Sequence, residues 1–405
     1  MATRARRVAL MQAFALALAG AAARAEAQGG TDTSARRVAQ PDSMRAIPSR
    51  PDSASAPAVR TDSVRAAPFH DGSRGPLVLP ALFYTPETGI GGGIGALWVK
   101  GSTDGVTRPS TYTLDVLATR NGQFTLGNAG DIWTASNRWH LTYDALLSKY
   151  PYRFFGIGEA GVDSGETYTP TMRFLTLTAQ RLLLPGIYAG FKVGYDDVGI
   201  TEVVPGSILS RTTGSDGWKL VTVGLLANRD TRDRLYWPST GTFVGASVAR
   251  ASARLGSTHP FNRLTLDARR YFTVTGDHII ATQAWADLTD GVVPFDRLPQ
   301  IGGSSIARGY LTGRFRDQQA VAFQAEYRSP GFAMFETVPR FTIVAFAAVG
   351  NAAPVLRQLA ADQTHFAGGI GVRWALALPD RYNLRVDYGF GRSTRAFYIT
   401  VGEAF

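Results

Sequence analysis

The chain has 405 residues, of which 45% are hydrophobic, and a formal net charge of +10. No stretch reaches the roughly 20 apolar residues that a membrane-spanning helix needs, which excludes a helical membrane protein. Cysteine is absent, so disulfide frameworks and thiolate metal sites are excluded, and we predict neither a metal nor a cofactor. The basic residues are scattered and no RNA-binding motif accompanies them, so we predict no nucleic-acid partner.

Residues 1–27 have the features of a secretory signal peptide. Three arginines near the start precede a short apolar run over 8–23. The sequence Ala-Glu-Ala over 25–27 supplies a small-x-small cleavage site. We therefore expect an exported protein whose mature chain starts at Gln28.

Residues 28–75 are rich in Ala, Pro, Ser, Arg and Asp and contain few aromatic residues. Such a segment cannot bury enough apolar surface to offset the entropy of an ordered chain. We predict a disordered periplasmic leader, which either acts as a tether or docking strip or has no binding role.

From residue 76 onward, short segments alternate apolar and polar residues between turns rich in Gly, Pro, Asn and Asp. The segment near 381–390 is among the clearest. Its apolar face would point to lipid and its charged face to a wet lumen, as in a membrane barrel. The apolar face carries Tyr382, Leu384, Val386, Tyr388 and Phe390, and the polar face carries Arg381, Asn383, Arg385, Asp387 and Gly389.

Sixteen such segments can be delimited, an even number that suits a bacterial barrel. We therefore predict an all-β fold over 76–405, a monomeric transmembrane antiparallel β-barrel of sixteen strands surrounded by outer-membrane lipids. The segments lie near 77–84, 89–100, 109–119, 122–134, 138–149, 170–181, 187–198, 217–229, 242–252, 261–272, 277–288, 317–329, 339–350, 364–375, 381–390 and 395–405.

The sequence ends on Phe405, and Phe397, Ile399 and Val401 precede it at alternate positions. Outer-membrane barrels use a last strand with a final aromatic residue to be recognised and to close on the first strand. Together with the signal peptide, this ending predicts a location in the outer membrane of a Gram-negative cell.

Three motifs stand out within the predicted barrel. The first combines Asp230, Arg232 and Asp233 with Pro238 and Gly241, before a hairpin in the middle of the barrel. The third is the ending Ile-Thr-Val-Gly-Glu-Ala-Phe over 399–405.

The second motif begins with Gly302 and Gly303 and leads to the tripeptide Arg308, Gly309 and Tyr310. In this order and spacing, the three motifs resemble those of the Omp85 superfamily, whose barrel is also called the bacterial surface antigen domain and includes BamA-like and TamA-like barrels. The resemblance covers about 77–405.

The resemblance implies that Arg308 lies in a long extracellular loop, 289–316, which folds back into the lumen. A lumenal guanidinium needs carboxylates or carbonyls around it. Alternation along the next segment points Glu326 inward, so it is the first candidate partner. The family carries a second acid where this chain has Ala348, and Asp387 is the candidate substitute. Arg308 either anchors the loop or takes part in a moving insertion mechanism.

Three functions remain open. The resemblance implies insertion or translocation of proteins or lipids, with client or accessory envelope proteins as partners. The 48 residues between the signal peptide and the barrel are too few for even one of the family's POTRA domains, so we expect a barrel without them. A gated or passive pore for small solutes is the alternative.

The third function, hydrolysis, would need a catalytic group such as His140 with Asp144, and we expect no enzyme. Insertion would use a weakly paired seam between the first and last strands. Glycines in the first strands would either weaken this seam or ease curvature; they are Gly89, Gly91, Gly92, Gly93 and Gly95.

Overall fold

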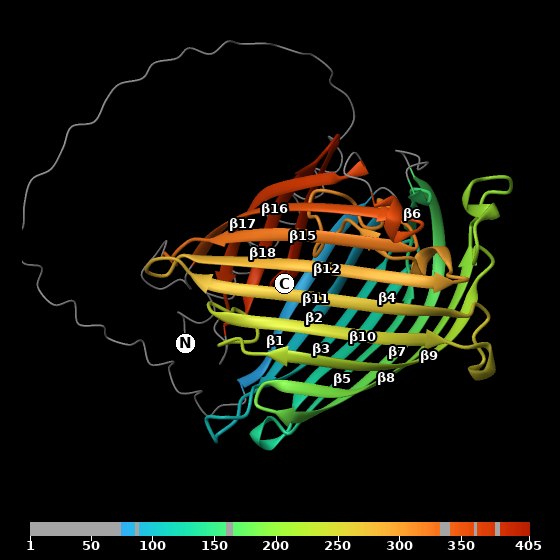
Figure 1. The fold of residues 1–405 in the computed structure, drawn as a ribbon. Helices are drawn as coiled ribbons and strands as arrows, with labels where there is room; N and C mark the ends of the chain where they lie inside the picture. The colour runs from blue at the N-terminus through green and yellow to red at the C-terminus, as the bar shows by residue number, and fades with distance from the viewer. Residues whose placement is uncertain (1–73, 86–88, 159–164, 333–340, 360–362, 377–380) are drawn as a thin grey trace, which may run out of the picture.

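The computed structural model describes residues 74–85, 89–158, 165–332, 341–359, 363–376 and 381–405 (Figure 1). The predicted signal peptide, and the leader up to residue 73, lie outside the described residues. Among the residues described, no helix is long and apolar enough to cross a membrane.

Nineteen strands are described, and three of them have only two or three residues, namely β6 (Tyr152–Phe154), β13 (Gln300–Ile301) and β14 (Phe315–Arg316). The other strands match the sixteen predicted segments in place, with ends shifted by a few residues. They are β1 (Arg74–Thr85), β2 (Gly89–Lys100), β3 (Ser110–Thr119), β4 (Phe124–Trp133), β5 (Trp139–Lys149), β7 (Glu166–Leu184), β8 (Ile187–Thr201), β9 (Trp218–Asp230), β10 (Gly241–Ala251), β11 (Phe261–Thr273), β12 (Ile279–Gly291), β15 (Gln319–Arg328), β16 (Phe341–Ala353), β17 (His365–Ala375), β18 (Asn383–Gly391) and β19 (Thr394–Val401).

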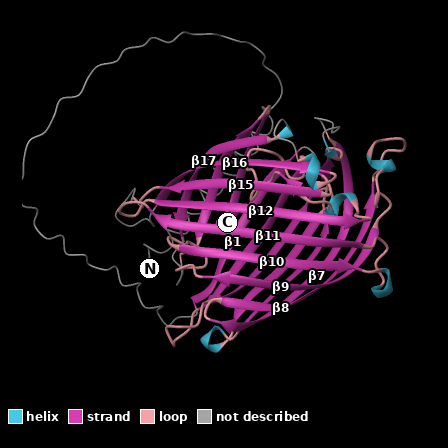
Figure 2. Ribbon diagram, viewed as in Figure 1, coloured by secondary structure: helices cyan, strands magenta, loops and turns pink. Residues whose placement is uncertain are grey.

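Each long strand pairs antiparallel with the next one along the chain, from β1 through to β19. Figure 1 shows this sheet wrapped around on itself, so that β1–β4 lie behind β10–β12. The fold is a transmembrane antiparallel β-barrel made almost wholly of strands (Figure 2).

Burial along the strands is the reverse of that in a water-soluble core. On β17, Phe366 is 69% exposed, whereas Arg373 on the opposite face is fully buried. On β18, Phe390 is exposed and Asp387 is fully buried. Apolar side chains that face outward and charged ones that face a filled lumen fit a barrel surrounded by lipid, where strands alternate in this sense.

The connections differ at the two ends of the barrel. One end, the loop end, carries the longest connections, 150–165, 202–217 and 292–318, together with 120–123, 252–260 and 392–393. The other, the turn end, carries 101–109, 134–138, 185–186, 231–240 and 274–278. Short 3₁₀ helices lie in these connections and in 354–364, namely Ala135–Asn137, Leu209–Arg211, Ala253–Leu255, Phe295–Arg297 and Leu356–Gln358.

Two details differ from the expectations. Tyr382 does not face lipid, since β18 begins only at Asn383 and Tyr382 is buried, with its ring 3.9 Å from that of Tyr236. That prediction was wrong because the predicted segment began two residues before the strand does. The glycines from Gly89 to Gly95 lie on β2 and pair with β1 and β3, so they are one strand away from the β1–β19 edge.

Candidate functional site: an arginine clamp in the barrel lumen

Loop 292–318 connects β12 to β15 and carries Arg308 into the barrel. Within it, β13 pairs with β14 as a short ribbon, and Arg308 lies in the segment between them. Ile301, Ala307 and Tyr310 pack with alanines of β15, β16 and β17 in one buried apolar cluster. The loop is therefore attached to the inner wall by ordinary core packing, which places the guanidinium of Arg308 in the lumen.

The guanidinium of Arg308 is held by two carboxylates. Nη2 donates to Oε2 of Glu326 on β15 over 2.7 Å, and Nη1 donates to Oδ2 of Asp387 on β18 over 2.6 Å. Its carbon Cζ also lies 3.7 Å from the ring centre of Phe346. Arg308 is 1% exposed, so the structure brings both candidate acids to a buried cation. We call Arg308, Glu326 and Asp387 the clamp.

Ala348, which stands where the family has its second acid, lies in the apolar cluster with Tyr310. The acid that meets Arg308 in its place is on β18, two strands further along the sheet than β16.

Other arginines surround the two clamp acids. Glu326 accepts from Arg328 over 2.8 Å and from Arg373 over 3.2 Å, in addition to Arg308. Asp387 accepts from Arg373 over 2.5 Å. Breaking a buried ion network by removing one partner leaves an uncompensated charge, at a cost of about 3–5 kcal/mol. Loss of any one of these charged side chains would therefore leave an uncompensated charge inside the barrel.

The residues after Arg308 attach the loop to the last strands. The amide of Gly309 donates to the hydroxyl of Tyr398 on β19 over 3.2 Å, and that hydroxyl donates to the carbonyl of Tyr310 over 2.8 Å. The hydroxyl of Tyr310 donates to the carbonyl of Phe366 over 2.8 Å. Gly309 has φ +131°, and a Cβ there would lie 2.5 Å from the backbone of Phe390. Only glycine fits this approach of loop to wall.

Gly302 and Gly303 turn the loop before the clamp. Their φ values are +114° and +101°, in the region that favours glycine. A Cβ on Gly302 would lie 2.2 Å from the carbonyl oxygen of Leu311. The amide of Gly303 donates to the carbonyl of Tyr310 over 2.9 Å. The turn therefore brings together the two ends of segment 303–310, which carries Arg308.

The first motif builds the turn 231–240 between β9 and β10. The carboxylate of Asp230 accepts two hydrogen bonds of 2.9 Å from Arg232 and one of 2.7 Å from Arg108. Asp233 accepts from the backbone amides of Ser239 and Thr240. Gly241 has φ +99° and passes close to the carbonyl of Thr231. These contacts make the turn a compact unit.

Trp237 of this turn is buried. The guanidinium carbons of Arg328 and Arg381 lie 4.5 and 4.2 Å from its ring centre. Arg328 also donates through Nη1 to the carbonyl of Pro238 over 3.2 Å. Because the Nε of Arg328 donates to Glu326, this side chain joins the turn to the clamp.

The end of the sequence reaches the same arginine. Phe405 is buried with Tyr271 and Ala281, and its carbonyl lies 3.5 Å from Nη2 of Arg328. Phe397, Ile399 and Val401 lie at alternate positions on β19, and Ile399 and Val401 are exposed on the outer wall. Arg328 therefore contacts the regions of the first and third motifs directly and is joined to Arg308 of the second motif through Glu326.

The candidate hydrolase pair is not brought together. The Nε2 atom of His140 lies 3.0 Å from Oδ1 of Asp131, and its ring stacks on Trp133 at 3.9 Å between centres. Asp144 has no recorded contact with His140 among the described residues. The imidazole is thus committed to a neighbouring acid and an indole at the turn end.

The sequence matches the family model of the Omp85 superfamily domain over residues 116–405. The chain belongs to the Omp85 superfamily. A search of curated proteins found no match.

Two solved structures have a similar fold. One is BamA from Haemophilus ducreyi lacking POTRA domains 1–3, at 13% identity and a TM-score of 0.53, covering 81% of this chain and 70% of that one. The other is CdiB from Escherichia coli, at 11% identity and a TM-score of 0.54, covering 80% of this chain and 61% of that one. At these identities the likeness shows the fold, and this chain spans less than two thirds of CdiB.

The family fixes the setting of this Omp85 barrel. It is a barrel of the Gram-negative outer membrane, as the motifs indicated. Barrels of this membrane have long extracellular loops and short periplasmic turns. The loop end with loop 292–318 therefore faces outward, and the turn 231–240 faces the periplasm.

Three residues that contact the clamp or its loop were not identified as partners from the sequence. Arg373 donates to both clamp acids, Glu403 accepts from Nε of Arg373 over 2.7 Å, and Tyr398 holds the loop backbone. Alternation along β17 does place Arg373 inward, and that is the only local signal. Its partners come from β15, β18 and the end of the chain, which no local pattern connects.

Proposed function

We propose that this barrel inserts or translocates polypeptides at the outer membrane, with loop 292–318 as a lumenal element that holds the last strands in register. The observation that carries the proposal is the clamp itself. Arg308 joins an acid on β15 to an acid on β18, and Gly309 binds Tyr398 on β19. Movement of the loop would therefore act directly on the strands beside the β1–β19 edge.

The edge itself supports this role. In the registers of the described residues, β1 pairs only with β2 and β19 only with β18, whereas each long strand between them pairs on both sides. Unpaired backbone groups at a sheet edge are a template for another strand. A client strand that added there would pair with these groups without displacing another strand. The proposed partners are unfolded client or accessory envelope proteins together with outer-membrane lipids.

The test combines depletion with reconstitution. Depletion in a native host should reduce other barrels in the outer membrane. The purified full chain in liposomes should speed the folding of an unfolded client barrel, and Arg308→Ala should lower that rate. Asp197→Asn, on the outer wall and outside the clamp, is the control. Unchanged barrel levels together with no acceleration by the intact protein would overturn the proposal.

A gated or passive solute pore is the second candidate. It is favoured by carboxylates on the part of the lumen wall away from the loop, where Asp115 and Asp144 are exposed. Planar-bilayer recording distinguishes the two functions. The intact protein should conduct little if loop 292–318 fills the lumen, and removal of residues 301–312 should raise conductance. A large steady conductance of the intact protein would favour the pore.

A further inference from the structure

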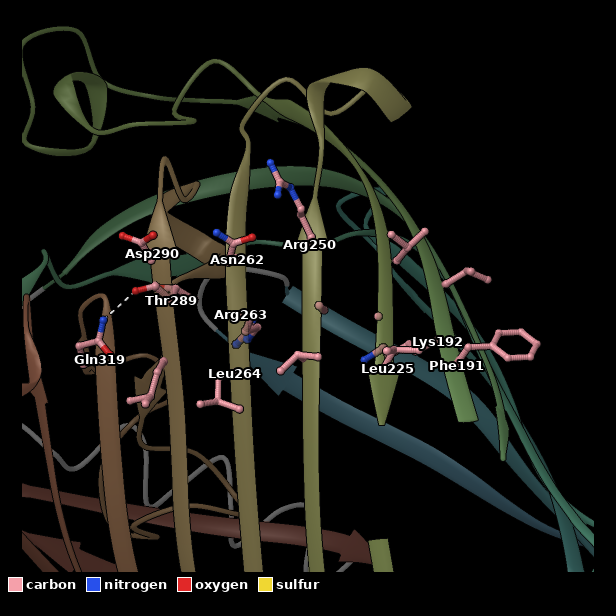
Figure 3. A pocket seen from close by; sticks show the side chains of 16 residues that line it. Phe191, Lys192, Leu225, Arg250, Asn262, Arg263, Leu264, Thr289, Asp290 and Gln319 are labelled. Atoms are coloured by element: carbon pink, nitrogen blue, oxygen red, sulfur yellow. Dashed lines mark hydrogen bonds between the residues drawn. The ribbon is translucent and has the colours of Figure 1, made fainter. Parts of the chain in front are cut away.

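A groove crosses the outer wall of the barrel over β8–β12, towards the loop end (Figure 3). Two rows of outward side chains form its edges, and the strand registers align each row. In the upper row, Arg250 is paired with Asn262, and Asn262 with Asp290. In the lower row, Val248 is paired with Leu225 and with Leu264. Figure 3 shows Arg250, Asn262 and Asp290 at one height, with Leu264 and Leu225 below them.

The groove lies on the lipid side of the sheet. The residues between the two rows point to the lumen, so only their backbone forms the floor. Among them, Arg263 makes an ion pair with lumenal Asp287 and donates to the carbonyl of Arg297 in the inserted loop. Gly224 and Ala249 of the same register row have little or no side chain.

The lower row is apolar, and its members range from half-buried to exposed. Leu225 is 66% exposed, and Phe191 and Val248 are each more than half exposed. Leu264 and Leu288 continue the row on β11 and β12. An apolar row of this kind, at the edge of a groove, suits an acyl chain that lies along it.

The upper row has a different chemistry. In the described part of the chain, no ion pair or side-chain hydrogen bond is recorded for Arg250, Asn262 or Asp290, and all three are exposed. A free guanidinium is a bidentate donor to phosphate. An amide and a carboxylate beside it are acceptors and donors for hydroxyl groups. Arg250 is the penultimate residue of β10, next to the connection 252–260 at the loop end.

We propose that this groove binds a phosphorylated, acylated sugar lipid of the outer leaflet. Its phosphate meets Arg250, its sugar hydroxyls meet Asn262 and Asp290, and an acyl chain lies over the Leu225 row. The polar row lies on the loop-end side of the apolar row, as the phosphate and sugar of such a lipid lie on one side of its acyl chains. This inference does not depend on the proposed function of the clamp.

The test is native mass spectrometry of the full chain released from detergent with a defined lipid. The probes are a diphosphorylated hexa-acylated disaccharide lipid, its dephosphorylated form, and phosphatidylglycerol, which carries a phosphate but no sugar. Arg250→Gln should lower occupancy by the first probe about fivefold, the factor that one basic side chain contributes near an anionic lipid surface. Asn262→Leu should weaken binding of that probe but leave phosphatidylglycerol unchanged.

Arg270→Gln is the matched control, because Arg270 is also exposed, on β11, but at the turn end. It should leave occupancy unchanged, and heat resistance on gels verifies that each variant is folded. Equal loss in the two arginine variants would reduce the effect to general charge attraction. Equal binding of the dephosphorylated probe would show that no phosphate contact forms. A doubled protein mass that depends on Leu225 would show that the groove binds a second copy of the chain. Each of these results overturns the proposal.

Discussion

Arg308 and Asp387 are 79 positions apart in the sequence, yet their side chains meet at 2.6 Å inside the barrel. Asp387 lies on β18, and Glu326, the other acid on Arg308, lies on β15. The second acid of the clamp is therefore not on β16, where the family carries it. Substitutions in the clamp should therefore have effects on stability that differ from those in the exposed ion pairs of the molecule.

Glu326→Gln should destabilise the barrel more than Asp387→Asn does. Glu326 accepts hydrogen bonds from three guanidinium groups, whereas Asp387 accepts from two and has a third, Arg385, at 3.6 Å. We expect a loss of about 3–5 kcal/mol for Glu326→Gln, measured by urea unfolding in detergent. Asp197→Asn is the control, since its partner Arg173 is 64% exposed and such pairs contribute about 0–1 kcal/mol. A similar loss in Asp197→Asn and Glu326→Gln would show that the buried ion pairs contribute no more to the free energy of unfolding than an exposed one.

Ala348→Asp should not restore a better clamp. Ala348 packs in the apolar cluster with Ala307 and Tyr310, and Asp387 already occupies Arg308. A new carboxylate there would be buried among apolar groups, which is costly without a partner. We expect a lower unfolding temperature than for Ala348→Ser, which changes the volume less and adds no charge. A rise in the unfolding temperature would mean that Arg308 can accommodate a third acid.

Gly309→Ala should release the loop, whereas Gly256→Ala should not. Both glycines have positive φ, +131° and +97°, so both variants carry backbone strain. Only Gly309 is confined, because a Cβ there meets Phe390 at 2.5 Å, while nothing lies within 4 Å of a Cβ on Gly256. Limited proteolysis within 301–312 should be faster in Gly309→Ala. Equal protection in both variants would contradict the close approach.

Arg328→Lys should loosen the turn 231–240 while the loop stays in place. Lysine can keep one ion pair with Glu326, but it lacks the planar fork with which Arg328 also reaches Pro238 and Phe405. Hydrogen exchange should therefore rise over 231–240 and remain unchanged over 301–312. Faster exchange in both segments would instead mean that Arg328 holds the loop as well.

The strands were predictable because their information is local. Alternation along each segment separates outward Phe390 from inward Asp387 without knowledge of the rest of the chain. The motif around Arg308 also indicated a lumenal loop and both acids that contact it.

The partners of Arg373 and Arg328 were not predictable, since they depend on how the strands are staggered around the barrel. Trp237 illustrates the same limit. It comes from a turn between β9 and β10 and ends between Arg328 of β15 and Arg381 before β18. Tyr382 was misplaced for a related reason, because its aromatic partner, Tyr236, belongs to that distant turn.

The place of the second acid determines which part of the wall can deform. With its acids on β15 and β18, the clamp ties together four consecutive strands, β15 to β18, as one stiff panel. Had the acid been on β16, only two adjacent strands would have been joined. Any widening of the barrel must then be absorbed by strands outside the panel, from β1 to β12.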